Sequence, residues 1–185
     1  GDVFLQKGAF LDLTQYAANS GSGASDSILE LRNGNERIIN GTIVGGLGAF
    51  SQQGGTTNLY NTANSFGGDL TIAAGTMRVM SLADAGYDSS AGSGANLRFG
   101  GLGTGTMEYI GTGSSTNRAI YLDGTAGQNA VISSNGTGAL TMSGDVVAVA
   151  EAKTFTLTGE NRGENTFSGN IVPASSLESD VIDLV

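Results

Sequence analysis

Asp84 and Asp88 are the two residues whose type and spacing come closest to a site that could do chemistry. They lie four positions apart in a stretch rich in glycine and serine. Both carboxylates could meet across one loop and bind Ca²⁺ together with backbone carbonyl oxygens. The alternative, which we prefer, is that both side chains solvate a surface turn. The sequence leaves calcium binding at Asp84 and Asp88 open.

The other acidic residues do not form the clustered carboxylates that polysaccharide-cleaving enzymes need on one face. Most are scattered along the chain, and the last group alternates with apolar residues over 178–184, as outward positions of a strand would: Glu178, Asp180 and Asp183. The glycine-rich runs at 45–48 and 100–103 lack the Lys-Ser/Thr of a phosphate-binding loop, so we interpret them as turns.

Three residue types with particular chemistry are absent: the chain has no His, no Cys and no Trp. Without His there is no Ser-His triad, and without Cys there are no disulfides or thiolate ligands. Trp is the best side chain for stacking a sugar ring or a base. We therefore expect no enzyme, and we assign no catalytic, cofactor-binding or metal-binding residue.

The composition is acidic and poor in charge, with 14% charged residues and a net charge of −9 over 185 residues. An acidic surface repels nucleic acid and anionic lipid, so we expect neither as a partner. No apolar run is long enough to span a bilayer, which predicts no membrane insertion by this segment. The chain begins at Gly1, so we expect a processed protein or one piece, 1–185, of a longer repeat protein.

Short alternating apolar and polar runs bounded by Gly, Asn or Ser recur along the whole chain, and they predict an all-β protein. One helical turn is expected at residues 81–84. The expected strands are residues 3–5, 9–13, 28–32, 37–44, 70–72, 76–80, 96–99, 106–110, 119–122, 130–133, 139–142, 146–150, 154–158, 170–172 and 181–184.

Strands this short favour a solenoid, in which each coil adds two or three strands to parallel sheets. At about 20–30 residues per coil, the chain would form six to nine coils. Seven apolar pairs should point inward: Leu11/Leu13, Leu29/Leu31, Leu70/Ile72, Met77/Val79, Leu97/Phe99, Leu140/Met142 and Phe155/Leu157. The residue between each pair should point outward: Asp12, Glu30, Thr71, Arg78, Arg98, Thr141 and Thr156.

Internal repeats support the solenoid. Asn64-Ser-Phe-Gly-Gly-Asp-Leu70 recurs as Asn165-Thr-Phe-Ser-Gly-Asn-Ile171, and Gly75-Thr-Met-Arg-Val79 recurs as Gly105-Thr-Met-Glu-Tyr109. Residues 138–142 and 153–157 are weaker copies of the second motif. The recurrent asparagines could hydrogen-bond between coils or simply occupy turns.

The run from Asn61 to Val79 resembles the autotransporter-associated β-strand repeat of bacterial surface passengers. The matching parts are Asn64-Ser-Phe-Gly-Gly, Leu70-Thr-Ile72, Ala74-Gly75 and Thr76-Met-Arg-Val79. The resemblance implies a right-handed parallel β-solenoid located outside the cell or on the bacterial surface. It transfers no catalytic residue, because the repeat has none.

These observations predict an extracellular structural protein, a solenoid segment of a passenger, stalk or fibre. We expect it to stack end to end, or to associate laterally, with further repeats or copies, because open solenoid ends accept another strand. The alternative is an adhesin that binds a surface or glycan through its outer face or through loops at 83–95 and 111–117. A carbohydrate-active solenoid enzyme or a phage tail-spike segment is less favoured.

Overall fold

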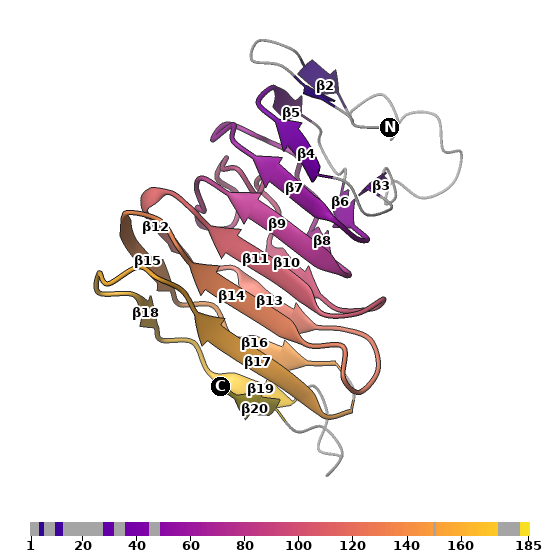
Figure 1. The fold of residues 1–185 in the computed structure, drawn as a ribbon, viewed down its shortest axis with the longest axis vertical. Coiled ribbons are helices and arrows are strands. Elements are labelled where there is room, and N and C mark those ends of the chain that lie inside the picture. The colour runs from indigo at the N-terminus through magenta and orange to yellow at the C-terminus, as the bar shows by residue number, and fades with distance from the viewer. Residues whose placement is uncertain are drawn as a thin grey trace.

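The computed structural model describes residues 4–5, 10–12, 28–31, 36–44, 49–149, 151–173 and 182–185. Within these residues every regular element is a strand. Figure 1 shows short strands stacked in chain order, with the N-terminal coils at one end and the C-terminal coils at the other. The predicted all-β parallel solenoid is confirmed.

Two sheets run the length of the stack and two smaller ones lie at its side (Figure 1). The eight-stranded sheet contains β1 (Phe4–Leu5), β4 (Glu36–Ile39), β7 (Thr56–Leu59), β9 (Gly75–Val79), β11 (Gly105–Tyr109), β14 (Ala130–Ser134), β17 (Lys153–Thr158) and β20 (Ile182–Leu184). The seven-stranded sheet contains β3 (Ile28–Leu31), β6 (Ala49–Gln52), β8 (Leu70–Ile72), β10 (Asn96–Phe99), β13 (Ala119–Leu122), β16 (Val146–Ala148) and β19 (Ile171–Pro173). A three-stranded sheet contains β12 (Thr112–Thr116), β15 (Gly138–Met142) and β18 (Thr166–Phe167), and β2 (Phe10–Asp12) pairs with β5 (Thr42–Val44).

Every pairing between these strands is parallel, as coaxial coils require. The number of residues per coil varies, as the difference between paired residue numbers shows. The coil from Phe50 to its partner Leu70 is much shorter than the coil from Phe4 to its partner Ile38. The eight strands of the longest sheet fall within the six to nine coils expected. The right hand of the coil stays a prediction, which the general handedness of parallel crossovers favours.

The internal repeats coincide with the strand register. Gly75–Val79 lies directly beside its copy Gly105–Tyr109, so that Met77 pairs with Met107. The longer offset spans four coils, because Leu70 is connected through successive pairs to Ile171. The two weaker copies do not follow this register: residues 138–142 form β15 in the three-stranded sheet, and Leu157 pairs with Ile132, two positions out of phase.

The core is a thin column of apolar side chains enclosed by the sheets, as the alternation predicts. The fully or almost fully buried members of the expected pairs are Leu70, Ile72, Met77, Val79, Leu97, Phe99, Leu140, Met142 and Phe155, and Leu157 is partly buried. The outward residues Thr71, Arg78, Arg98, Thr141 and Thr156 are all partly exposed. The side chains of Leu11/Leu13 and Leu29/Leu31, and of Asp12 and Glu30 between them, lie outside the described part of the molecule.

Two expected elements are wrong in detail. The strand expected at 37–44 is divided at Asn40-Gly41 into β4 and β5, because the chain turns a corner there. The helical turn expected at 81–84 is absent, and these residues form an irregular segment. Four strands were not predicted: β6, β7, β12 and β18. Their residues are mostly polar, and parallel pairing with neighbouring coils stabilises them.

Glycine is needed where adjacent coils approach closely. Gly75 begins β9 with φ of 83°, and a Cβ atom there would collide with the carbonyl oxygen of Gly55 in the preceding coil. No helix in the described residues is long and apolar enough to cross a membrane.

Candidate functional site

The acidic residues considered as ligands do not gather. Asp84 and Asp88 are exposed in one loop, and within the described residues no group of three or more His, Cys, Asp or Glu side chains is placed to bind a metal ion. Asp183 lies in β20, while Glu178 and Asp180 lie outside the described residues. The glycine-rich run at 45–48 also lies outside the described residues. The run at 100–103 forms the turn from β10 to β11, as expected.

The loop between β9 and β10 has an exposed tip on a buried base. The tip is residues 84–88, all exposed, and its largest side chain, Tyr87, is 69% exposed. The base is residues 89–92, all buried. Within the loop, Ser90 Oγ accepts hydrogen bonds from the N–H groups of Met80 and Ser81. A fixed base therefore supports an exposed tip.

The second expected loop, residues 111–117, is mainly the strand β12, and it supports the first loop. Ser114 Oγ accepts from the N–H of Leu82, and Thr116 Oγ1 donates to the carbonyl of Ala83 at 2.8 Å. Asn117 Oδ1 accepts from the N–H of Ala85 at 2.9 Å. The two loops proposed from the sequence thus form one structure across two coils.

Arg118, just after β12, is the largest fully buried side chain, with 1% of its surface exposed. Its Nη1 donates to the carbonyl of Ala91 at 2.9 Å, and Nη2 donates to the carbonyls of Gly92 (2.5 Å) and Tyr87 (3.2 Å). A longer hydrogen bond runs from Nη2 to Ser89 Oγ. One guanidinium therefore satisfies several backbone acceptors of the loop.

The acceptors of Arg118 are neutral, which is unusual for a buried cation. Burial lowers the pKa of Arg118, while the more distant carboxylates of Asp84 and Asp69 oppose the shift. Its Nε is the buried side-chain atom with no hydrogen-bond partner among the described residues. No pattern in the sequence singles out this residue, because an Arg after a polar stretch is expected to be exposed.

Asn64 connects three coils from a fully buried position. Its Oδ1 accepts from the N–H of Ile43 in the preceding coil at 2.8 Å, and its Nδ2 donates to the carbonyl of Ser90 in the following coil at 3.0 Å. The same Nδ2 makes a longer bond to the carbonyl of Asn61. The asparagine satisfies backbone groups at a corner where the strands do not pair.

Asn165 repeats this arrangement four coils later. Its Oδ1 accepts from the N–H of Leu140 in the preceding coil at 2.9 Å, and its Nδ2 donates to the carbonyl of Asn161 at 3.2 Å. Unlike Asn64, Asn165 is exposed. We call residues 61–68 and 161–169 the first and second asparagine corners. Their asparagines do bond between coils, but to backbone groups or to a serine or threonine hydroxyl rather than to one another.

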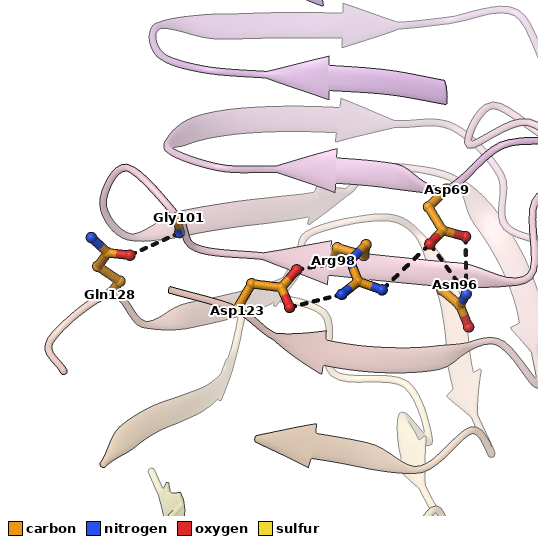
Figure 2. A network of polar contacts seen from close by, with 6 residues as sticks. All are labelled: Asp69, Asn96, Arg98, Gly101, Asp123 and Gln128. Atoms are coloured by element: carbon orange, nitrogen blue, oxygen red, sulfur yellow. Dashed lines mark hydrogen bonds and ion pairs between the residues drawn. The ribbon is translucent and has the colours of Figure 1, made fainter. Parts of the chain in front are cut away.

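Charged side chains form a column on the outer face of the seven-stranded sheet, shown in Figure 2. Arg98 lies between two carboxylates: its Nε and Nη2 donate to Asp123 at 2.8 and 2.9 Å, and its Nη1 is 3.5 Å from Asp69. Asn96 donates to the same Asp69. Burial alone would lower the pKa of Arg98, but Asp123 and then Asp69 raise it. The guanidinium also lies 4.7 Å from the ring centroid of Tyr121.

A similar column crosses the outer face of the eight-stranded sheet. Arg78 Nε donates to Glu108 Oε2 at 2.6 Å, and Asn135 Nδ2 donates to Glu108 Oε1 at 2.8 Å. Burial would raise the pKa of Glu108, but the bonds from Arg78 and Asn135 outweigh it and lower the pKa. Both columns connect successive coils, so they support the stack and leave no free acid for catalysis at these positions.

A cavity of about 300 Å³ opens near the C-terminal end of the stack, between β17 and the three-stranded sheet. Its apolar lining is Ile132, Leu140, Met142, Leu157 and Phe167, and its polar lining includes Asn161 and Asn165. No carboxylate is among these lining residues, and the lining combines apolar side chains with neutral polar ones.

Comparison with known proteins agrees with this architecture. The adhesin BmaC autotransporter of Brucella suis is 35% identical to this chain over an alignment 185 positions long, which covers 89% of the chain. The chain is therefore similar to the passenger-type β-solenoids of autotransporters, and the resemblance found in its sequence is confirmed. It spans 5% of the length of that relative. No family model matches the chain, and no solved structure matches it.

Similarity to an autotransporter adhesin implies a location at the bacterial cell surface or in the space outside the cell. The location expected from the resemblance is therefore confirmed.

Proposed function

We propose that this autotransporter passenger segment has a structural role: it adds length and stiffness to a surface adhesin by continuing a column of coils. The observation that supports this role is the continuity of register. The column Phe50, Leu70, Leu97, Ile120 and Val146 runs through five successive coils in parallel pairs. Because every coil bonds only to its neighbours, such a stack extends by repetition.

The proposal includes stacking against further coils or copies at the ends. Apolar side chains are exposed at the C-terminal end: Leu184 and Val185 in or beside β20 are 55% and 70% exposed, and Val172 in β19 is 37% exposed. β20 and β19 are edge strands of their sheets. An edge strand with apolar side chains is a surface for adding another strand.

Sedimentation of the 185-residue chain over a range of concentrations tests the stacking. We expect concentration-dependent association that Leu184→Lys weakens. The matched control is Leu102→Lys, because Leu102 is 62% exposed but lies in a turn within the stack. A monodisperse monomer at high concentration, or equal effects of the two substitutions, contradicts end-to-end stacking.

A second candidate function is adhesion through the loop tip. The relative carries the word adhesin in its name. Here Tyr87 is exposed at the tip, on a base that Arg118 supports. A rigid aromatic side chain at a preorganised tip contributes binding area at a small entropic cost.

A glycan array probed with the chain and with Tyr87→Ala tests this second function. We expect glycan binding that Tyr87→Ala removes and that Tyr60→Ala, at a partly exposed tyrosine in another coil, leaves unchanged. An array without a signal removes glycan adhesion as a function of this segment.

A further inference from the structure

The two asparagine corners differ in the surroundings of their phenylalanine. Phe66 in the first corner is fully buried, whereas Phe167 in the second is only partly buried. Phe167 also lines the 300 Å³ cavity. The next coil therefore covers the phenylalanine of the first corner, whereas the equivalent surface of the second corner is exposed.

A Gly-Ser-Gly segment covers the first corner. Gly92 lies against the ring of Phe66, where a Cβ atom would come within 2.5 Å of a ring carbon. Ser93 donates its N–H to the carbonyl of Phe66 at 2.9 Å. Gly94 lies on Gly68, and a Cβ atom on Gly94 would collide with the Gly68 carbonyl oxygen. Only glycine fits at both ends of this segment.

The same close approach recurs down the stack. A Cβ atom on Gly144 would collide with the carbonyl of Arg118, and one on Gly169 would collide with the carbonyl of Gly144. Gly169 is the counterpart of Gly68 in the second corner. A backbone that packs on Gly169 as Gly169 packs on Gly144 meets the same restriction.

We propose that the surface formed by Phe167, Gly169 and the adjoining cavity binds a Gly-Ser-Gly type segment of a further parallel coil. One glycine lies on the ring of Phe167, the next backbone N–H donates to the carbonyl of Phe167, and the second glycine lies on Gly169. This inference rests on the proposed structural role and adds the chemistry of the partner.

The cavity lining favours this occupant over a glycan or a lipid. Leu157 and Phe167 present apolar surface, which a coil covers with its own inward side chains. In the first corner the N–H of Ser93, next to the ring contact of Gly92, donates to the carbonyl of Phe66, and a backbone can repeat this bond at the carbonyl of Phe167. A bulky ligand could not approach as closely as glycine.

The test extends the chain by the coil that covers the first corner. Leu184 pairs with Phe155, and this column continues through Ala130 and Gly105 to Gly75, so Val185 corresponds to Thr76. A copy of residues 77–99 appended after Val185 therefore continues in register. Because the chain has no Trp, Phe167→Trp is a single fluorescent reporter of the surface.

We expect the appended coil to shift the emission of the Phe167→Trp reporter to shorter wavelength and to remove its quenching by acrylamide. The control is the same extension with Gly92→Leu in the appended copy, which should leave the reporter quenched. An unchanged reporter with the unmodified extension, or equal protection by both extensions, overturns the proposal.

A second measurement does not depend on the extension. In the 185-residue chain Gly92 and Gly86 both have positive φ, of 70° and 88°, but only Gly92 faces a ring, and a Cβ atom on Gly86 meets nothing within 4 Å. Gly92→Ala should therefore lower the unfolding midpoint more than Gly86→Ala, and equal shifts overturn the proposal. If the chain self-associates while the reporter stays quenched on extension, this inference fails alone. If the chain is monomeric while the extension protects the reporter, the stacking of copies fails alone.

Discussion

The coil that contains the exposed loop and the coil through β15 satisfy the backbone hydrogen-bonding groups of their third side in different ways. From Met77 to Met107 the chain uses 30 residues, and from Ile132 to Leu157 it uses 25. In the shorter coil the third side is β15, paired in parallel with β12 and β18. In the longer coil this side is irregular, and side chains from β12 and Arg118 bind its backbone.

This difference shows how a solenoid accepts an insertion. Backbone pairing needs coils of matching length, so an added segment loses its partners. Here the neighbouring coil supplies side-chain donors and acceptors in their place, and the extra residues leave the stack as the tip at 84–88. A loop fixed in this way can vary in sequence at its tip without disturbing the core.

The largest effect should come from removing the buried guanidinium. Arg118→Met removes the guanidinium donor to the carbonyl of Ala91 and leaves the carbonyl of Gly92 with the Ser89 hydroxyl alone, and we expect the free energy of unfolding to fall by about 3 kcal/mol. Hydrogen exchange in the loop should rise. Arg98→Met, on the outer face, is the control, and urea unfolding should show a loss below about 1 kcal/mol. Equal losses would mean that Arg118 has no special role in the loop.

Removing the corner asparagine should lower the free energy of unfolding more at the buried first corner than at the exposed second corner. Asn64→Ala removes two buried hydrogen bonds between coils, with an expected loss of about 2 kcal/mol in urea unfolding. Asn165→Ala, at an exposed position, should lose about 1 kcal/mol. A larger loss at Asn165 would contradict the view that the following coil strengthens the corner.

Glu108 gives the regular coils a modest pH dependence. Its pKa is lower in the folded chain than in the unfolded chain, so its stabilisation is complete at neutral pH and is lost as the pH falls through the lowered pKa. Glu108→Gln should flatten the dependence of the unfolding free energy on pH in the acidic range. The difference at neutral pH should be about 1 kcal/mol or less. An unchanged pH profile would show that the pair with Arg78 does not form in solution.

The smallest effect is expected at the loop tip. Tyr87 is 69% exposed, so Tyr87→Ala should change the unfolding free energy by less than about 0.5 kcal/mol. Thermal and urea unfolding measure this. A larger loss would mean that the tip packs against the stack, and it would weaken the case for Tyr87 as a binding residue.

The sequence predicted the parts of the fold that repeat. Met77 and Met107 occupy equivalent positions in similar segments, and equivalent segments pair in a solenoid. The sequence did not predict the elements that are stabilised by contacts with another coil. The polar residues of β7 and β12 become strands through their neighbours, and Arg118 is buried because a loop in the preceding coil presents carbonyls to it.

Amide-to-amide nuclear Overhauser contacts between β9 and β11 test the parallel coil most directly. In coaxial parallel coils, residue numbers on the two strands increase together, so the contacts of residues 75–79 with residues 105–109 keep a constant difference, as Met77 with Met107 does. A hairpin arrangement would give contacts in which one number rises as the other falls. The first pattern is the result that the solenoid predicts, and the second would contradict it.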